Sequence, residues 1–418
     1  MSTPRCTGRP PPSPGSAGDS RCRARSPTRR APAPAIRRTT QRNRKPFLLT
    51  EFAHAMGNGP GGLAEYLRLC DEYPRVQGGY VWEWMDQGLR TRDARGREFF
   101  GYGGDFGEDL HDGNFICDGL VLPDRTPSPG LLEYAKAIAP VRIGPGPEPD
   151  TLTVENHYEV LDLSHLRFTW SLAREGVELA QGVLPTPELA AGEHGRLPLP
   201  RLDPPPATAG RRPQSGEEAA GELWLTVQAE LAKPTDWAPE GHLVAWGQLR
   251  LSATGRRRPV GLPGPARMEG EQILLAPGRF DRITGALLGI GGPYPDSCQA
   301  VRVGRFCATV DELQTPYVRP QENGNRADVR WAAFTDRAGN GLRVAGEDPF
   351  HFAARRWTDR QLDAARHHSD LVPGPVIHLH TDHAVQGLGT AAVGPGVLPQ
   401  YRLGLAPADF AFIWTPLQ

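Results

Sequence analysis

The segment "KPFLLTEFAHAMGNGPGG", Lys45–Gly62, decides the fold of the first globular part of the chain. An apolar run of strand length ends in a carboxylate, Glu51, and is followed by His54 and a cluster of glycines. The next residues have apolar side chains at helical spacing and stop at Pro74. A second strand, rich in aromatic and β-branched residues, is expected over 76–89. Strand, helix and strand in close succession predict a βαβ unit, in which buried strands run parallel.

The pattern changes after about residue 142. "DTLTVENHYEVLDLSHLRFTW" (150–170) and "GELWLTVQAELAK" (221–233) alternate apolar and polar residues, which is typical of an antiparallel β-sandwich. A polar, proline-rich loop is expected over 201–222, and mostly short strands from about residue 265 onward. The predicted fold class is therefore multidomain α/β plus all-β. We expect an α/β region at 45–142, a β-sandwich at 143–255 and a second β domain at 265–418.

Residues 1–44 differ from the rest because they are rich in Arg, Pro and Ser, with Asp19 as their only acid. Such a composition cannot bury enough apolar surface to order itself, so we expect a disordered tail. A nucleic-acid-binding tail, a transit peptide and a wrongly assigned start of the gene are the alternatives.

The overall composition favours a soluble globular protein, with 39% apolar and 23% charged residues among 418. A formal net charge of −1 favours neither nucleic acid nor a membrane surface as partner. No apolar run is long enough to span a membrane, and no secretory signal is recognised at the start. The six cysteines show no CxxC pairing, so we expect free thiols in a reducing, cytoplasmic location rather than a metal or redox site.

Glu51 would lie where barrel enzymes place catalytic groups, at the carboxyl end of a parallel strand. His54 is close enough in sequence to contact the same ligand, and the indole of Trp82 or Trp84 could stack on the apolar side of a sugar ring. Each residue also has an ordinary explanation. A strand-end glutamate is often a surface or ion-pair residue, a histidine is often structural, and both tryptophans could belong to the core. Spacing leaves the choice open.

A family resemblance favours the functional interpretation. "LLTEFAHAMGNGPGGLAEY" (48–66), "YGGDFGEDLHDGNFICDGLVLPDRTPSPGLLEYAKA" (102–137) and "DELQTPYVRPQENGNRADVRW" (311–331) resemble the bacterial β-galactosidases of glycoside hydrolase family 2. The resemblance implies the C-terminal part of a TIM barrel, an immunoglobulin-like β-sandwich and a shortened β-supersandwich domain. It also implies a retaining hydrolase that acts on terminal β-D-galactose residues in substrates such as lactose.

Five residues match positions that the family uses. The resemblance makes Glu51 the catalytic nucleophile, His54 a hydrogen-bonding partner of galactose hydroxyls, and Trp82 the floor of the galactose subsite. The carbonyl of Phe115 and the side chain of Asp118 match ligands of an active-site Na+. A common family member has Asn at the position of Asp118, and both side chains offer oxygen to a hard cation.

Other parts of the family pattern have no counterpart here. These are the acid/base glutamate, the ligands of an active-site Mg2+ and the domains that precede the barrel. The stretch 282–306 joins motifs that lie far apart in the family, and Val393 stands near the position of an aromatic residue that covers the sugar. We therefore expect a C-terminal portion of a β-galactosidase.

Three alternatives to a self-sufficient enzyme stay open. The chain could be a subunit completed by a separate N-terminal chain, a non-catalytic carbohydrate-binding fragment, or the product of a badly joined gene. A homo-oligomer is also open.

Overall fold

The computed structural model describes residues 45–148, 150–200, 221–252, 267–269, 272–274, 282–288, 294–394 and 396–417. The predictions for the 1–44 tail and most of the 201–222 loop lie outside these ranges, as do residues 289–293 of the 282–306 junction. Among the described residues, no helix is both long and apolar enough to cross a lipid bilayer.

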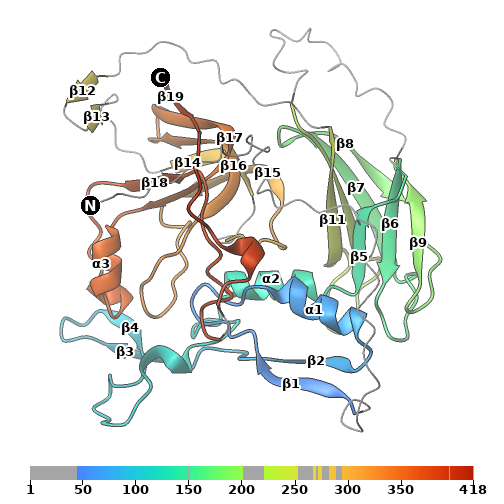
Figure 1. Cartoon of the computed structure of the whole chain (residues 1–418), viewed down its shortest axis with the longest axis horizontal. Coiled ribbons are helices and arrows are strands. Elements are labelled where there is room, and N and C mark those ends of the chain that lie inside the picture. Colours follow the sequence, from blue (N-terminus) through green and yellow to red (C-terminus); the bar gives the residue numbers. More distant parts are fainter. Residues whose placement is uncertain are drawn as a thin grey trace, which may run out of the picture. The chain divides into compact units, whose positions relative to one another are not determined.

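The predicted strand–helix–strand unit is present (Figure 1). Strand β1 (Phe47–Phe52) pairs in parallel with β2 (Val76–Val81), and helix α1 (Leu63–Glu72) connects them. The helix begins directly after Gly62, whose φ of 72° lies in the left-handed region that glycine adopts without strain. The parallel pairing places the carboxyl ends of both strands, and hence Glu51 and Trp82, at the same edge.

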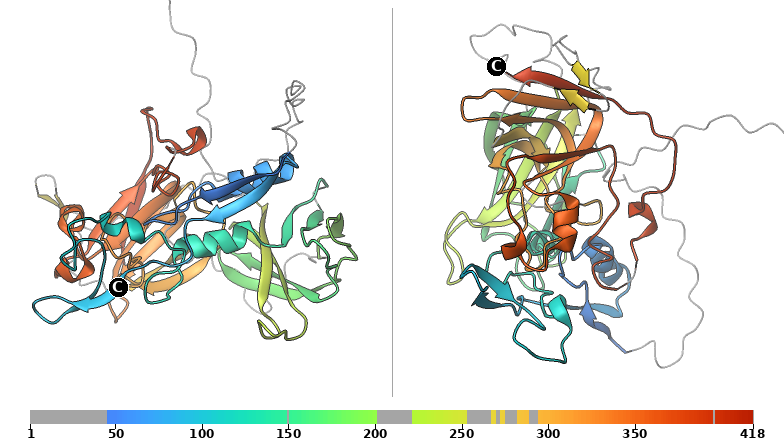
Figure 2. Two further views of the ribbon diagram at one scale, coloured as in Figure 1. Left: turned by 90° about the horizontal axis from the view of Figure 1, so that it is seen from below. Right: turned by 90° about the vertical axis from the view of Figure 1, so that its left-hand side faces the viewer.

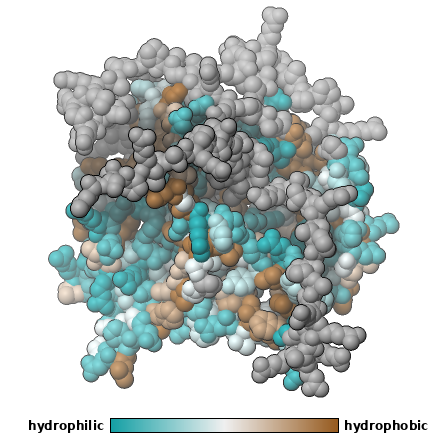
Figure 3. All heavy atoms as spheres, in the orientation of Figure 1, coloured by the Kyte–Doolittle hydropathy of each residue, from teal (hydrophilic) through white to brown (hydrophobic). Residues whose placement is uncertain are grey.

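The expectation that β1 is a buried strand is wrong. Phe52 is buried, whereas Phe47 and Leu48 are 43% and 47% exposed. The reason is that β1 and β2 form a sheet of two strands among the described residues, while parallel strands are normally covered on both faces. Hydrophobic surface is accordingly visible among the polar atoms in the lower half of Figure 3, the region of these strands in Figure 1.

The strand predicted over 76–89 is also too long. It breaks into β2 and β3 (Leu89–Arg92), and β3 forms a hairpin with β4 (Glu98–Gly101). Between them the chain leaves β1 and pairs with a later segment, because Glu83 N donates to Asp118 O and Leu120 N donates to Glu83 O. Two short helices complete this region, η2 (Gly113–Ile116) and α2 (Pro129–Ala137).

The described residues between 141 and 252 form two antiparallel sheets, drawn in green in Figure 1. One sheet contains β5 (Val141–Pro145), β6 (Thr151–Asn156) and β9 (His194–Pro198). The other has the order β11-β10-β7-β8, with bounds β7 (Leu166–Arg174), β8 (Val177–Leu184), β10 (Leu223–Leu231) and β11 (Leu243–Ser252). Alternate residues of β10 are buried in one shared apolar core with β6 and β7, which explains the period-two sequence pattern.

The last region is built on a further antiparallel sheet, seen in orange and red in Figure 2. Its strands are β14 (Arg282–Leu288), β15 (Val303–Thr309), β16 (Arg326–Thr335), β17 (Gly341–Arg355), β18 (His378–Asp382) and β19 (Phe412–Leu417). A small hairpin, β12 (Arg267–Glu269) and β13 (Gln272–Leu274), precedes it. The short helices are α3 (Asp359–Ala364), η3 (His368–Asp370) and η4 (Pro399–Tyr401).

A buried carboxyl group joins α2 to the last region. Glu133 is 2% exposed, and its two oxygens accept hydrogen bonds from Gln299 N at 3.0 Å and Ala300 N at 2.8 Å. Burial is the main cause that raises the pKa of Glu133 to about 7, and the nearby charges of Asp296 and Glu65 act in the same direction. The folded chain therefore holds the Glu133 proton to a higher pH than the unfolded chain does.

The raised pKa of Glu133 predicts a pH-dependent stability. Between about pH 4.5 and pH 7 the folded state binds more protons at Glu133, so the free energy of unfolding should fall by roughly 3 kcal/mol as the pH rises through this window. Urea unfolding at several pH values would measure this slope. Glu133→Gln should remove the part of the slope that Glu133 contributes, whereas Glu72→Gln, at an exposed position on α1, should leave the slope unchanged. An equal slope in all three proteins would contradict the assignment.

Candidate functional site

His54 links two carboxylates at the edge where β1 ends. Its Nε2 lies 2.9 Å from Glu51 Oε1, and its Nδ1 lies 3.4 Å from Asp118 Oδ2. A neutral imidazole donates through one nitrogen only, whereas an imidazolium donates to both carboxylates. The His54 side chain is 10% exposed and Asp118 is buried, so the contact between these two is largely shielded from water.

Two aromatic rings flank the same histidine. The centroid of Trp82 lies 6.4 Å from that of His54, and the centroid of Phe115 lies 6.1 Å from it. The structure thus brings together around His54 all five residues that the family resemblance singles out. Their proximity is a finding, while their individual roles in binding and catalysis stay predictions.

Main-chain hydrogen bonds fix this arrangement. Ala53 has a φ of 52°, which turns the chain sharply after β1. Trp82 N then donates to Phe52 O at 3.1 Å, and Ala55 N donates to Trp82 O at 2.9 Å. Glu83 N donates to Asp118 O at 2.7 Å. Three extended segments that are distant in sequence are therefore held side by side.

The site has an exposed side and a buried side. The side chain of Glu51 is 51% exposed and Trp82 is 40% exposed, so a ligand can reach both. Asp118 is fully buried, and burial raises the pKa of its carboxyl group, although the hydrogen bond from His54 acts in the opposite direction. The site therefore has a solvent-accessible carboxylate in front and a buried one behind.

Sequence reasoning missed one acidic residue of this site. Asp86 is 2% exposed, and its Oδ1 accepts a hydrogen bond from Gly119 N at 2.6 Å. Burial raises the pKa of Asp86 to about 7, and the charges of Asp118 and Glu83 add to the effect. The signal was available, since an aspartate within the aromatic run "WEWMD" (82–86) has little reason to be there unless the fold uses it.

The buried side fits a hard cation. No group of three or more His, Cys, Asp or Glu side chains in the described ranges is arranged to hold a metal ion. However, Asp118 Oδ1 and Asp86 Oδ2 are buried and accept no hydrogen bond from any described residue. Such oxygens normally have a partner, and carboxylate and carbonyl oxygens are what Na+, Mg2+ and Ca2+ bind.

The loop that follows Glu51 is held by the last region of the chain. Asn58 Nδ2 donates to Glu322 O, and Gly62 N donates to Asp296 O, both at 2.8 Å. The Asp296 carboxylate in turn accepts hydrogen bonds from three successive main-chain amides and from one hydroxyl, those of Leu388, Gly389 and Thr390. Segment 387–394, which contains Val393, is thus anchored beside the loop that begins at His54.

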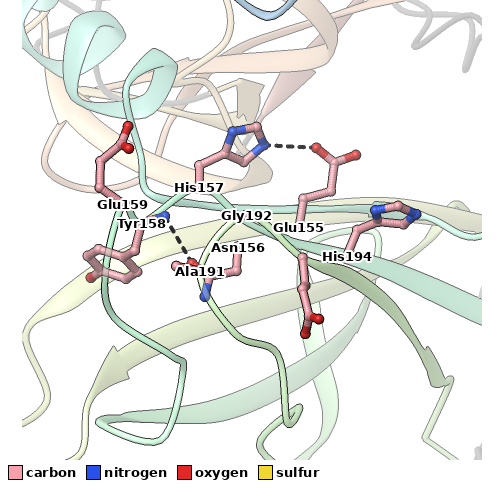
Figure 4. A pocket seen from close by; sticks show the side chains of 9 residues that line it. Glu155, Asn156, His157, Tyr158, Glu159, Ala191, Gly192 and His194 are labelled. Carbon is pink, nitrogen blue, oxygen red and sulfur yellow. Dashed lines mark hydrogen bonds and ion pairs between the residues drawn. The ribbon is translucent and has the colours of Figure 1, made fainter.

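A recess elsewhere contains none of the predicted residues. It encloses about 610 Å³ between the end of β6 and the start of β9 and is lined by residues 155–159 and 191–194. Figure 4 shows His157 turned toward Glu155, with which it makes a 3.0 Å contact, while the rings of Tyr158 and His194 point away from this pair. Because the side chains of this recess do not converge on one point, the chemistry favours the Glu51 site over the recess.

Comparison with known proteins gives three family matches along the chain. The family described as glycosyl hydrolases family 2, TIM barrel domain, matches residues 25–143. The family of β-galactosidase domain 4 matches residues 152–252, and that of the β-galactosidase small chain matches residues 276–414. The first match begins before Lys45, outside the described ranges. These matches confirm a TIM-barrel-type domain followed by β domains, whereas the predicted domain boundaries and the shortening of the barrel stay predictions.

Curated relatives agree with these matches. A β-galactosidase of Arthrobacter sp. (strain B7) is 29% identical over 521 residues, covering 88% of this chain and 50% of the relative. A β-galactosidase of Vibrio cholerae is 29% identical, covering 84% of this chain and 45% of the relative. One of Aeromonas hydrophila is 38% identical over 236 residues, covering 56% and 21%. The chain thus spans about half the length of the first two relatives, or less.

The packing around Gly61 predicts that the loop after Glu51 tolerates no side chain there. A Cβ at Gly61 would overlap Thr390 N and lie 2.6 Å from Asp296 Oδ2, so the backbone of segment 387–394 would have to move. Gly61→Ala should lower the free energy of unfolding by about 1–3 kcal/mol, measured by chemical denaturation. Gly144→Ala in β5, where a Cβ meets nothing within 4 Å, should change it by less than about 0.5 kcal/mol. Equal stabilities of the two variants would contradict this packing.

Proposed function

Because its matched segments make this chain a β-galactosidase-type protein of glycoside hydrolase family 2, we propose that Glu51 is the nucleophile of a retaining β-galactosidase. The proposed reaction is hydrolysis of terminal, non-reducing β-D-galactose residues from galactosides such as lactose. The observation that carries the proposal is the position of Glu51. It lies at the carboxyl end of β1 with its carboxylate half-exposed and 2.9 Å from His54.

The chemistry follows from an exposed carboxylate that is held in place. A Glu51 oxygen attacks the anomeric carbon of galactose, the bond to the leaving oxygen breaks, and a galactosyl ester of Glu51 forms. Water then attacks the same carbon from the opposite side, which releases galactose with its original configuration. The contact to His54 Nε2 orients the attacking carboxylate, so less freedom has to be lost when the substrate binds.

The residues around Glu51 suit recognition of a sugar. Trp82 is 40% exposed, so its indole can lie against the apolar side of the galactose ring. His54 is near enough to Glu51 to donate to a galactose hydroxyl once the substrate displaces part of its present contact. A hydrogen bond that strengthens as positive charge develops on the sugar would lower the barrier rather than only tighten binding.

The carbonyl of Phe115 and the side chain of Asp118 would hold an active-site cation, which the family resemblance gives as sodium. Such an ion would supply positive charge and a fixed template for sugar hydroxyls. The family's magnesium ligands match no residue of this chain, and no step is assigned to that ion. In the free site, Asp118 holds His54 through Nδ1.

A second candidate is a subunit completed by another polypeptide. A retaining glycosidase needs a second carboxyl group as acid/base, and the family's acid/base glutamate matches no residue here. Several large apolar side chains in the β1–β2 sheet, or directly after it, are exposed, which favours such a partner. They include Phe47, Leu48, Tyr80 and Trp84. Further barrel strands would cover them and could bring the missing acid. With this candidate we also propose a separate partner chain or a homo-oligomer, and a cytoplasmic location.

Covalent trapping tests the nucleophile without needing the acid/base residue. The probe is a 2-deoxy-2-fluoro-β-galactoside with a dinitrophenolate leaving group, which departs without being protonated. The expected result is one fluorogalactosyl group per chain, located on Glu51 by peptide mass spectrometry. Glu51→Gln should take up no label, whereas Glu83→Gln, changed at a neighbouring carboxylate, should be labelled.

The outcomes separate the two candidates. Labelling at another residue, or equal labelling of Glu51→Gln, would overturn Glu51 as nucleophile. No labelling of the chain alone, with labelling restored by an added N-terminal half of a β-galactosidase, would favour the second candidate. Hydrolysis of an unactivated galactoside by the chain alone would mean that it supplies its own acid/base group.

A further inference from the structure

Two buried carboxylates behind His54 have unused hydrogen-bonding capacity. Asp86 is 2% exposed and Asp118 is fully buried, yet Asp86 Oδ2 and Asp118 Oδ1 have no hydrogen-bond partner in the described part of the chain. A buried polar atom without a partner costs on the order of 1–3 kcal/mol, and a charged one costs more. Two such oxygens in neighbouring side chains leave room for a proton, a water molecule or a cation as their partner.

The fold brings these carboxylates together by a tight backbone contact. Asp86 Oδ1 accepts a hydrogen bond from Gly119 N, the amide that directly follows Asp118. A Cβ at Gly119 would overlap the backbone at Asp86 and lie 2.7 Å from Met85 Cα, so this close approach requires glycine. The two carboxylates are also near enough to repel each other electrostatically.

The local charge balance is strongly negative. Glu83 acts electrostatically on both aspartates, and Glu51 acts on Asp118. In the described part of the chain, His54 is the basic side chain that contacts Asp118. A site with Asn in place of Asp118, as in a common family member, would carry one negative charge fewer. The aspartate in this chain therefore calls for more positive charge than a monovalent ion supplies.

We propose that Asp86 and Asp118 together bind one divalent, oxygen-preferring cation of the calcium class, in place of the monovalent sodium that the family resemblance implies. Two carboxylates cannot by themselves fill the coordination shell of such a cation, so other oxygen ligands are needed. Calcium accepts carbonyl and water oxygens in an irregular shell, which the Phe115 carbonyl can join, whereas magnesium demands a stricter octahedron. The inference deepens the cation site of the proposed function and rests on it for that site's place beside Glu51.

The bound cation would act on the nucleophile through His54. Asp118 uses Oδ2 for the contact to His54 Nδ1 and leaves Oδ1 for the cation. Fixing Asp118 therefore fixes the imidazole, and the imidazole fixes Glu51. In this arrangement Asp86 and Asp118 are positioning residues, because neither contacts Glu51 itself in the interactions described.

Cation binding by the full, chelator-treated chain tests this without turnover. Thermal unfolding is followed while CaCl2, MgCl2 or NaCl is titrated at constant ionic strength. Calcium should raise the Tm in a saturable way, and more than sodium at equal ionic strength. Asp86→Asn and Asp118→Asn should each weaken the calcium response about tenfold or more, and Asp118→Asn should shift the preference toward sodium.

A matched control and a second signal keep the test decisive. Asp296→Asn alters a buried aspartate whose two oxygens are both hydrogen-bonded, so it should lower the Tm without changing the calcium response. If the aspartate variants do not fold, the wild-type chain is tested with terbium, whose luminescence is excited through nearby tryptophan. Calcium should displace the bound terbium and quench this luminescence, whereas sodium should not. Equal responses to sodium and calcium, or an unchanged calcium response in Asp86→Asn, would overturn the proposal.

Failure of this inference and failure of the proposed function look different. Calcium binding with no fluorogalactosyl label on Glu51 would support the cation site and contradict the assignment of Glu51 as nucleophile. A label on Glu51 with no preference for calcium over sodium would do the reverse.

Discussion

A ladder of main-chain hydrogen bonds across three separate segments is the constraint on which the site depends. The end of β1 pairs with Trp82, and the residue after Trp82 pairs with Asp118. The pairing brings Glu51, Trp82 and Asp118 to one edge, where a single histidine contacts both carboxylates. Each side chain has its direction fixed by a backbone that is already hydrogen-bonded, so the constellation forms when the sheet edge forms.

The acidic side chains of the site are chemically alike but differ in how deeply they are buried. Glu51 is half-exposed and can meet a substrate, whereas Asp118 and Asp86 are shut away from water with oxygens that no described residue satisfies. A carboxylate in water keeps its ordinary behaviour, while one in a low-dielectric interior must bind a proton or a cation. Burial thus gives the same functional group two different environments, which is the basis of the two roles proposed for these carboxylates.

The later β region contributes to the site although it supplies none of the five predicted residues. Asp296 binds the loop after β1 through its carbonyl and segment 388–390 through its carboxylate, so the two loops are held as a unit. The alignment with the Arthrobacter relative extends over 521 residues against 418 in this chain, so the relative has internal residues that this chain lacks.

The sequence by itself determined the local elements and indicated the family that the chain resembles. Apolar spacing predicted β1, α1 and the antiparallel strands, and the motif around Glu51 indicated a family 2 glycosidase, because both are written in contiguous residues. Only the tertiary structure decided that β1 is largely exposed, that the strand from Val76 stops at Val81, and that Asp86 joins Asp118. These features depend on which segments meet, and pairing between residues 33 positions apart leaves no periodic trace in the sequence.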